Sequence, residues 1–438
     1  MSGKRMRILH YSLGFPPYRT GGLTKYCVDL MLTQKEQGCE TALLWPGRIH
    51  VLHKAVRIHQ HRMWNGVENY EVINPLPIAL DEGIADVQAY MAPTDGSSYR
   101  GFLLKYNPDM VHLHTLMGLH CEFLNICREL NIRIIFTSHD YYGLCPKAVF
   151  FRDGYPCEND HNCYDCIECN QTALSLKKII MMQSSAYRIL KDTVILKKLR
   201  RRHRSAFFEM RPLDKAQEAI EGERASEYRK LRNYYVMMLE KVDFIHFNST
   251  VAENIYRRYL TPRNSRVAAI THRDITDHRK IKDFDHEHLR LAYLGPARPY
   301  KGFFFLLSTL DAIWESGERN FELRIYTATS QRRPYMMNVQ ENYTYTQLEK
   351  IFDNADLLVV PSLYHETFGF NVLEALSYGV PVLVSRYVGA KDLVSANFIY
   401  DDLQERVLEI IKDRKILVTE NRKIVSSEFM ESLICKVR

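Results

Sequence analysis

The sequence has no apolar run long enough to cross a membrane. A spanning helix needs about 20 consecutive apolar residues, and no run in the 438-residue chain has that length. The apolar segment near the N-terminus, within MSGKRMRILHYSLGF, is short and is interrupted by His10, Tyr11 and Ser12. We therefore expect neither a membrane span nor a signal peptide, and we expect a cytoplasmic protein.

Disulfide bonds are also not expected. The ten cysteines would lie in a reducing compartment, where cysteines occur mostly as thiols or metal ligands. The sequence lacks low-complexity tracts, and it has no internal repeat beyond two similar alternating regions. With 46% hydrophobic and 25% charged residues, the composition is that of an ordinary globular protein.

Length and charge set further bounds. The chain is too long for one ordinary core and suits two domains of roughly 150 to 250 residues each. The formal net charge of +7 and the isoelectric point near 8.7 favour anionic partners such as phosphates, nucleic acids or an anionic membrane. Charge alone does not choose among them.

Short apolar runs alternate with helical patterns, which is typical of a doubly wound parallel sheet. A first series runs from MRILHYS through CETALLW, DMVHLH and RIIFTSHD, and a second begins near residue 288 with LRLAYLG, FELRIYTA and DLLVVPS. We therefore predict an α/β protein with two Rossmann-like domains, residues 1–271 and 288–438, and a polar linker at 272–287. About residues 150–235 are interpreted as a Cys-rich and basic helical insertion in the first domain.

Two glutamates follow the run DLLVVPS. Glu366 comes directly after this predicted strand, where the strand ends of an open parallel sheet leave a crevice for ligands. The turn HETFGF leads into a predicted helix, NVLEALSYG, whose first NH groups are unpaired and attract a phosphate or hydroxyl oxygen. Glu374 lies about one turn into that helix, and its carboxylate can accept hydrogen bonds from vicinal hydroxyls.

This stretch resembles the E-x7-E signature of the retaining glycosyltransferases of family 4, which have the GT-B fold and use nucleotide sugars. The matching residues are Pro361, Ser362, Glu366, Gly369, Glu374, Ala375, Gly379, Pro381 and Val382. The resemblance implies that Glu366 and the backbone of Phe368, Gly369 and Phe370 contact the donor sugar. It also implies that Glu374 holds the ribose hydroxyls. Two solvated acids are the alternative interpretation.

A second part of the resemblance is YLGPARPYKGFFFLL. Cations there would neutralise a diphosphate leaving group, lysine as a point charge and arginine as a fork. The family usually has Gly-Arg followed by Lys-Gly, and Lys301 and Gly302 match the second pair. Pro296 stands at the usual arginine position, so Arg298 is the candidate substitute, with a surface arginine beside a helix as the alternative.

The first domain carries two further matches. GFPPYRTGGLTKYCVDL resembles the family's glycine-rich loop, in which Gly21 and Gly22 would let the chain approach the donor phosphate or the acceptor closely. FTSHDYYG resembles the second family motif, which implies that His139 lies near the donor sugar and that Asp140 faces the acceptor. His114, at the end of a neighbouring run, is either a crevice residue or a hydrogen-bonded structural residue.

The family's retention of configuration is explained by a front-face route, in which the departing phosphate helps to deprotonate the acceptor hydroxyl. The protein then acts by stabilising the leaving group and positioning the substrates. No DxD-type motif stands where a metal site would need it, and GT-B enzymes generally require no catalytic metal. We expect Glu366, His139, Asp140 and Lys301 to be catalytic, without a cofactor.

Five cysteines cluster in GLCPKAVFFRDGYPCENDHNCYDCIECN. The C-x2-C spacing lets two thiolates bind one ion, and four sulfurs complete a tetrahedral zinc site. The preferred ligands are Cys145, Cys157, Cys163 and Cys166, with Cys169 as a substitute for Cys166. A similar arrangement occurs in some family 4 members. The expected zinc is structural, because four sulfur ligands leave no open position, and unliganded thiols are the alternative.

Residues 175–208 alternate apolar and basic side chains at roughly helical spacing. A basic amphipathic helix can lie on an anionic bilayer, which would suit a lipid-linked acceptor at the inner face of the membrane. The alternative is a solvated helix packed on its own domain. No motif supports nucleic-acid binding, so we expect no nucleic-acid partner.

Together these patterns predict a hexosyltransferase that moves a sugar from a nucleotide diphosphate sugar to a hydroxyl of a glycan or lipid-linked acceptor, as in polysaccharide or glycoconjugate biosynthesis. The active site is expected in the cleft between the domains, assembled by closure. Two alternatives stay open. One is a sugar-nucleotide epimerase of the same fold, and the other is a catalytically silent binding subunit, which the Pro296 departure suggests.

Overall fold

The computed structural model describes residues 5–50, 53–79, 82–158, 161–185, 187, 218–426 and 428. The chain divides into two compact units. The first unit comprises Met1–Phe150, Glu158–His246 and Tyr256–Arg266. The second comprises Phe151–Cys157, Phe247–Ile255 and Val267–Arg438. Each unit contains one large α/β sheet, which confirms the prediction of two Rossmann-like domains.

The first sheet has eight strands in the order β10-β9-β6-β5-β1-β2-β4-β3. The central strand β1 pairs in parallel with β2 on one side and β5 on the other, whereas β3 pairs with β4 in the antiparallel direction. The strands are β1 (Arg7–Tyr11), β2 (Glu40–Pro46), β3 (Arg57–Trp64), β4 (Val67–Ile73), β5 (Met110–Leu113), β6 (Arg133–Ser138), β9 (Phe244–Phe247) and β10 (Ser265–Val267).

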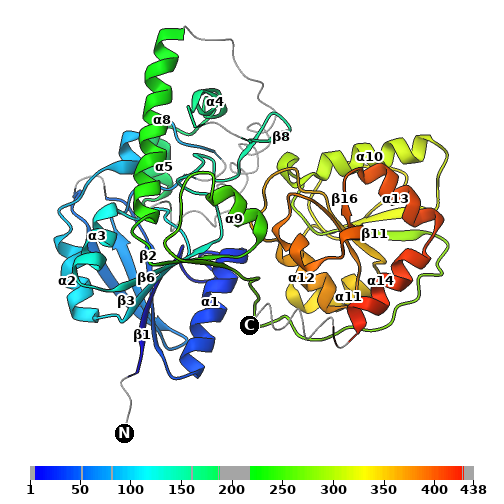
Figure 1. The fold of residues 1–438 in the computed structure, drawn as a ribbon, viewed down its shortest axis with the longest axis horizontal. Helices are drawn as coiled ribbons and strands as arrows, with labels where there is room; N and C mark the ends of the chain where they lie inside the picture. Colours follow the sequence, from blue (N-terminus) through cyan, green and yellow to red (C-terminus); the bar gives the residue numbers. More distant parts are fainter. Residues whose placement is uncertain are drawn as a thin grey trace. The chain divides into compact units, whose positions relative to one another are not determined.

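Helices pack on both faces of this sheet (Figure 1). The helices of the first unit are α1 (Gly22–Glu36), η1 (Gln88–Met91), α2 (Ser97–Tyr106), α3 (Cys121–Glu129), α4 (Tyr164–Cys169), α5 (Leu176–Met182) and α8 (Glu218–Leu239), whereas α9 (Thr250–Tyr256) belongs to the second unit except for Tyr256. Since α1 follows β1 toward β2 and α3 follows β5 toward β6, the chain leaves the central strands β1 and β5 in opposite directions. Such a switch point opens a crevice at the carboxyl edge of a sheet.

The hairpin of β3 and β4 was not among the strands predicted from the sequence. Asn65 and Gly66 form its turn, with φ of 47° and 78°. An Asn-Gly pair favours this left-handed backbone and is a strong hairpin signal when apolar residues flank it. The signal was therefore present in the sequence, within MWNGVENYEV.

The second sheet has six strands in the order β13-β12-β11-β14-β15-β16, and all the neighbouring pairs are parallel. Its strands are β11 (Leu289–Tyr293), β12 (Phe321–Ile325), β13 (Met336–Asn338), β14 (Leu357–Val360), β15 (Val382–Ser385) and β16 (Ile399–Tyr400). The helices are η2 (Pro299–Lys301), α10 (Phe303–Glu315), η3 (Tyr345–Gln347), α11 (Leu348–Asp353), α12 (Phe370–Ser377), η4 (Gly389–Leu393), η5 (Ala396–Phe398), α13 (Leu403–Lys412) and α14 (Lys415–Val425).

Apolar spacing explains how α10 packs. Leu306, Leu310 and Ile313 recur every three or four residues, so they share one face of the helix, and all three are fully buried against the strands. Figure 1 shows α10 on one side of the second sheet and α11 and α12 on the other. The chain therefore leaves the adjacent strands β11 and β14 in opposite directions, which gives the second sheet its own switch point.

Three segments singled out from the sequence are the linker, the insertion and the basic helix, and the structure describes them as follows. Residues 272–287 lie in the second unit and contain no helix or strand. The insertion contributes the short hairpin of β7 (Phe151–Arg152) and β8 (Tyr155–Pro156), as well as α4, α5 and α8. Residues 186 and 188–208 of the predicted basic helix lie outside the described residues.

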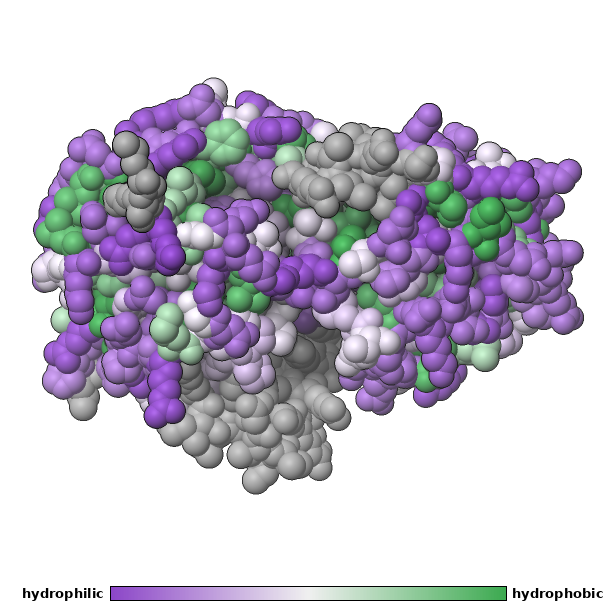
Figure 2. Space-filling view, turned by 90° about the horizontal axis from the view of Figure 1, so that it is seen from below, coloured by the Kyte–Doolittle hydropathy of each residue, from purple (hydrophilic) through white to green (hydrophobic). Residues whose placement is uncertain are grey.

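The described helices do not include a membrane span, since none of them is both long and apolar enough to cross a bilayer. On the face shown in Figure 2, hydrophobic residues are scattered among hydrophilic ones.

Candidate active site

Gly302 allows the ends of β11 and β14 to meet. Its φ is +71°, and a Cβ atom added there would lie 1.8 Å from the carbonyl oxygen of Pro361. A side chain at this position would therefore separate the two loops. Their contact is completed by the NH of Leu363, which donates to the carbonyl of Tyr300 at 2.9 Å. The loop after β11 thus lies directly against the loop after β14.

This contact brings together Lys301 and Glu366, two of the residues predicted from the sequence to be catalytic. Lys301 Nζ lies 2.6 Å from Glu366 Oε1, and Ser362 Oγ donates to Oε2 at 2.7 Å. Both charged side chains are partly buried, with 20% and 12% of their surfaces exposed. The Glu366 backbone is also held, because its NH donates to Tyr387 O and its carbonyl accepts from Gly389, each at 2.9 Å.

The N-terminus of α12 lies beside this carboxylate. Gly369 caps the helix with φ of +102° and provides no side-chain hydrogen bond, so the first NH groups lack a capping side chain. A Cβ at Gly369 would lie 3.6 Å from the carboxyl carbon of Glu366, which shows how close the helix start is to the acid. Phe368 is buried and stacks edge-on to Phe370, with ring centres 5.3 Å apart.

Glu374, which was predicted to hold the ribose hydroxyls, is almost fully buried. Its side chain is only 5% exposed, and its Oε1 lies 3.4 Å from His272 Nε2. The His272 ring packs edge-on against Phe370 and Tyr345. Within the described residues, neither ring nitrogen of His272 makes a hydrogen bond. Burial raises the pKa of Tyr343, and the nearby charge of Glu374 adds to this rise, so Tyr343 also lies beside this acid.

The backbone carbonyl of Arg298 accepts a hydrogen bond from the NH of Lys301 at 3.2 Å. Its guanidinium hydrogen-bonds the hydroxyl of Tyr300 and lies over that ring, 5.6 Å from its centre. Tyr300 meets Tyr364 edge-on at 5.1 Å, and Lys301 Nζ lies 5.0 Å from the centre of the Tyr364 ring. Sequence reasoning missed these two tyrosines, because a tyrosine in a loop carries no signal of its own.

In the first unit, the predicted glycines begin α1. Gly21 is its N-cap, with φ of +113° and no side-chain hydrogen bond, and Gly22 is the first helical residue. A Cβ at Gly21 would meet nothing within 4 Å, so the glycine is needed for its backbone angle rather than for space. As at α12, the unpaired NH groups of a helix start lie at the carboxyl edge of the sheet.

His139 and Asp140 follow β6 at the same edge, and both are half-buried. Asp140 Oδ1 accepts from the NH of Tyr142 at 2.9 Å, and its carbonyl accepts from Tyr256 Oη at 2.6 Å. Burial raises the pKa of Asp140 to about 6, although the Tyr142 NH and the Thr115 hydroxyl oppose the rise. Burial, with help from His246, lowers the pKa of His139 to about 3. His139 is therefore neutral near pH 7.

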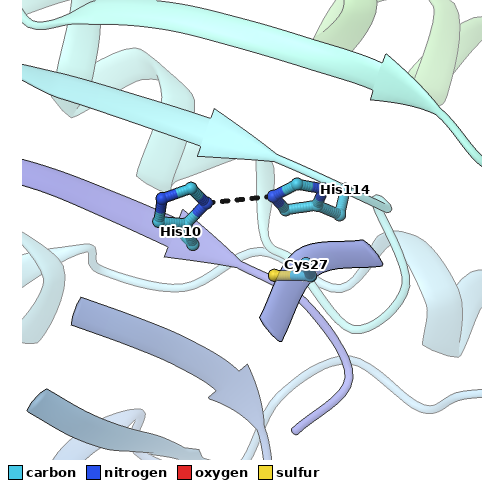
Figure 3. A group of neighbouring side chains, drawn as sticks. All are labelled: His10, Cys27 and His114. Carbon is cyan, nitrogen blue, oxygen red and sulfur yellow. Dashed lines mark hydrogen bonds between the residues drawn. The ribbon is translucent and has the colours of Figure 1, made fainter. Parts of the chain in front are cut away.

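His139 is one end of a row of histidines that crosses the sheet. His114 Nδ1 lies 3.4 Å from His139 Nε2, and His114 Nε2 lies 3.0 Å from His10 Nδ1 (Figure 3). His10 Nε2 in turn contacts Gln34 Oε1 at 2.8 Å. Because an amide oxygen only accepts, His10 Nε2 must carry a proton. His114 is thus a hydrogen-bonded residue of this row as well as a residue at the strand end.

The same row meets the geometric condition for a metal site. Among the described residues, His10, Cys27 and His114 are the group whose potential ligand atoms all lie within 4.8 Å of one another. Cys27 reaches the two histidines from α1 (Figure 3). Burial raises the pKa of its thiol to about 12. Since both nitrogens of His10 already have hydrogen-bond partners, the row accounts for this packing without an ion.

The predicted zinc cysteines gather around α8. Cys145, Cys163 and Cys166 are buried, and Arg232 Nη2 lies 3.7 Å from Cys166 Sγ. Burial lowers the pKa of Arg232, but Cys163, Tyr259, Cys166 and Cys145 together raise it by more. Cys157 and Cys169 are half-buried. Three of the four preferred ligands therefore surround one guanidinium.

Two family models match the chain. The model of Glycosyltransferase Family 4 matches residues 20–156, and the model described as Glycosyl transferases group 1 matches residues 274–425. The matched segments contain the glycine pair and His139 in the first unit, and Lys301, Glu366 and Glu374 in the second. A comparison with curated proteins found no match.

Solved structures share the fold at low sequence identity. Sucrose-phosphate synthase from Thermosynechococcus elongatus is 13% identical with a TM-score of 0.54, and the match covers 98% of this chain and 97% of that one. A trehalose-phosphate synthase from Burkholderia xenovorans, in complex with glucose-6-phosphate, is 11% identical with a TM-score of 0.55, and the match covers 99% of this chain and 97% of that one. Anabaena HepE, in complex with UDP and glucose, is 10% identical with a TM-score of 0.53, and the match covers 96% of this chain and 94% of that one. The two matched models and the shared architecture identify the chain as a glycosyltransferase of the GT-B fold.

Proposed function

We propose that the protein is a retaining hexosyltransferase that moves a sugar from a nucleotide diphosphate sugar to a hydroxyl of a glycan or lipid-linked acceptor. The observation that carries the proposal is the arrangement of Lys301, Ser362 and Glu366 beside the N-terminus of α12. It combines a cation, a carboxylate and unpaired NH groups at the switch point of the second sheet. A sugar diphosphate presents the complementary groups, namely hydroxyls and phosphate oxygens.

Each group would act on a different part of the donor. Lys301 and the first NH groups of α12 would stabilise negative charge as the diphosphate leaves. Glu366, released from Lys301, would accept hydrogen bonds from the sugar hydroxyls. Glu374 would hold the ribose hydroxyls, which requires His272 to give up part of its contact with the acid. Arg298 remains a candidate phosphate ligand, although its guanidinium hydrogen-bonds the Tyr300 hydroxyl.

In the first unit we assign donor contacts to Gly21, Gly22 and His139, and an acceptor contact to Asp140. A neutral His139 can donate or accept one hydrogen bond without adding charge. Asp140 has a pKa of about 6, so at pH 7 it is mostly ionised yet more basic than an ordinary aspartate. Such a carboxylate suits hydrogen bonding to an acceptor hydroxyl.

Transfer is tested by a thermal-shift panel of nucleotide sugars, followed by an assay with glycan and lipid-linked acceptors. A bound donor should raise the melting temperature, and NMR of the product should show the donor's anomeric configuration. Glu366→Gln should abolish transfer, whereas Glu405→Gln, an exposed glutamate on α13, should not. Conversion of the donor without any acceptor would point instead to an epimerase, and donor binding without any turnover would point to a silent subunit.

For the cysteines we propose one structural zinc, held by Cys145, Cys157, Cys163 and Cys166, or with Cys169 in place of Cys166. The nearness of buried Cys145, Cys163 and Cys166 to Arg232 supports this set, because a cation favours the thiolate form that binds zinc. Metal analysis should give one zinc per chain, and Cys163→Ser should remove it and lower stability. A metal-free protein whose stability does not respond to a chelator would contradict the site.

A lipid-linked acceptor would also bring the protein to the inner face of the membrane. Residues 175–208 supply the basic and apolar side chains for this contact. Vesicles with anionic lipid should co-sediment the protein, and vesicles of neutral lipid should not. Equal binding to both kinds of vesicle, or to neither, would contradict the proposal.

A further inference from the structure

A basic segment of the first unit supplies most of the lining of a pocket. Residues 48–62, RIHVLHKAVRIHQHR, contain four arginine or lysine residues and four histidines but no aspartate or glutamate. A pocket of about 320 Å³ opens within this segment, a volume typical of small-ligand sites. The polar side chains of this segment that line the pocket are Arg48, His50, His53, Arg57 and His59. No acidic residue lines it among the described residues.

Two buried polar residues hold the loop that forms this pocket. The NH of Asn74 donates to Arg48 O at 2.9 Å, its side-chain oxygen accepts from the NH of His50 at 2.7 Å, and its amide donates to the carbonyls of His53 and Ala55. Asn74 is 7% exposed and has a left-handed φ of +58°. The backbone NH and the side chain of Asn74 thus fix the backbone at Arg48, His50 and His53, from which three basic side chains project.

Glu71 holds Arg48 in place. Its carboxylate is fully buried, accepts from the NH of Arg48 at 3.1 Å and from His61 Nε2 at 2.7 Å, and lies 3.6 Å from Arg48 Nη2. A Cβ at Gly47 would lie 2.1 Å from the Glu71 side chain, so glycine is required there. The negative charge of Glu71 therefore lies beside both Arg48 and His61. Within the described part of the chain, Arg57 forms no ion pair and its exposed guanidinium is available to a ligand.

The position of the pocket in the sheet points to a substrate. Arg48 follows the end of β2 and Asn74 follows the end of β4, and both strands run parallel to β1. The pocket therefore opens at the carboxyl edge of the first sheet, the edge at which ligands bind in open α/β sheets. Gly21 and His139 follow β1 and β6 at this same edge.

We infer that this pocket binds the anionic group of the acceptor, a phosphate ester or a carboxylate. The assignment of this pocket to the acceptor rests on the proposed transfer function. The inference that the pocket binds an anion is independent of that function. Two arginine forks can each form paired hydrogen bonds to such an oxyanion, and the imidazoles of His50, His53 and His59 supply further donors. The apolar side chains of Ile58 and Ile73 complete the lining.

Inorganic phosphate is the first probe, used by calorimetry at constant ionic strength. The Lys301→Ala protein serves as the background, because it weakens phosphate binding in the second unit. Adding Arg57→Gln should weaken the remaining phosphate binding at least about tenfold, as expected for loss of a charge-assisted hydrogen bond. Arg62→Gln is the matched control, since Arg62 is an exposed arginine of the same strand that does not line the pocket. Equal phosphate affinity in the Arg57 and Arg62 variants would overturn the inference.

Two further measurements identify the source of the anion and connect it to transfer. Competition by glucose 6-phosphate would indicate a phosphate ester, and competition by glucuronate a carboxylate, while displacement by neither would overturn the inference. With an active acceptor, Arg57→Gln should raise the acceptor KM about tenfold with little change in kcat, and Arg62→Gln should change neither. If no sugar is transferred at all, the proposed function fails while the phosphate result still stands.

Discussion

At the scale of single residues, Lys301 and Glu366 hold each other in the site without a ligand. The 2.6 Å ion pair and the Ser362 hydroxyl satisfy both carboxylate oxygens. A donor diphosphate would compete for Lys301 and leave Glu366 to the sugar hydroxyls. Under the proposed function, the pair would be a preorganised arrangement in which each charge keeps the other in position until substrate binds.

Lys301→Ala should lower kcat by about a hundredfold to a thousandfold, the usual cost of removing one preorganised group that stabilises the leaving charge. Lys350→Ala, at an exposed lysine on α11, is the control and should leave kcat unchanged. Steady-state kinetics with circular dichroism as a folding check measures both. A Lys301 variant within threefold of the starting kcat would exclude its assigned role.

Asp140 gives a second prediction at this scale. Its pKa of about 6 in the folded protein lies above the ordinary value of 3.8, so the folded state binds the proton more tightly than the unfolded state. Its contribution to stability is fully present below about pH 4 and is lost as the pH rises through 6. Asp140→Asn cannot ionise, so it should be more stable than the wild type at pH 8, by about 1 to 3 kcal/mol.

Urea unfolding at pH 8 and pH 5 checks this. The advantage of Asp140→Asn should shrink at the lower pH, and Asp86→Asn, at an exposed aspartate of the same unit, should show no such trend. Sugar transfer should fall in Asp140→Asn although the protein is more stable. An Asp140→Asn protein less stable than wild type at pH 8 would show that its ionised form is stabilising.

At the scale of elements, the site depends on how closely the loop before α10 approaches the loop after β14. Gly302→Ala would place a methyl group 1.8 Å from Pro361 O at a φ of +71°. Gly317→Ala is the matched control, because Gly317 also has a positive φ of +101° but nothing lies within 4 Å of an added Cβ. The comparison separates the steric clash from the backbone strain.

We expect Gly317→Ala to cost about 1 to 2 kcal/mol for the left-handed backbone. Gly302→Ala should cost about 2 to 5 kcal/mol, because overpacking adds to the same strain. Chemical denaturation measures both values. Only Gly302→Ala should also lower transfer, since it would move Lys301 away from Glu366. Equal costs in the two variants would mean that the loops yield without strain.

At the scale of the whole molecule, buried neutral histidines should make the protein sensitive to acid. Burial lowers the pKa of His10 to about 4 and of His139 to about 3, and it lowers the pKa values of His112 and His114 well below 6.5. The unfolded chain therefore binds protons below about pH 6.5 that the folded protein does not. Stability present above pH 6.5 is lost as the pH falls toward about 3, by up to about 1.4 kcal/mol per pH unit for each histidine.

Fluorescence can follow this loss in the first unit. In a Trp314→Phe protein the remaining tryptophans, Trp45 and Trp64, both belong to that unit. The unfolding free energy should fall as the pH is lowered from 6.5 to 4. Asp140 offsets part of this fall, because its carboxyl takes up one proton more readily in the folded protein. His112→Gln should reduce the slope by about one proton, since one titrating group is removed. A stability that stays constant from pH 6.5 to 4 would contradict the buried neutral state.

Much of the fold was readable from local patterns. The runs that predicted strands in the first unit contain β1, β2, β5 and β6, because buried parallel strands are short continuous apolar segments. The β3–β4 hairpin was missed although Asn65 and Gly66 signalled it. In the second unit, Lys301, Gly302 and Glu366 could be proposed from the sequence because a motif keeps its residues close in sequence. The family models match the segments that carry these motifs.

The sequence by itself determined the α/β class, the two domains and the residues of the local motifs. Only the tertiary structure decided which distant residues meet. It placed Arg298 on Tyr300, buried Glu374 against His272, aligned His10, His114 and His139 across neighbouring strands, and gathered Arg48 and Arg57 around one pocket. The physical reason is that strand order and register set these contacts, and the sequence encodes them through the packing of the whole domain rather than through any short pattern.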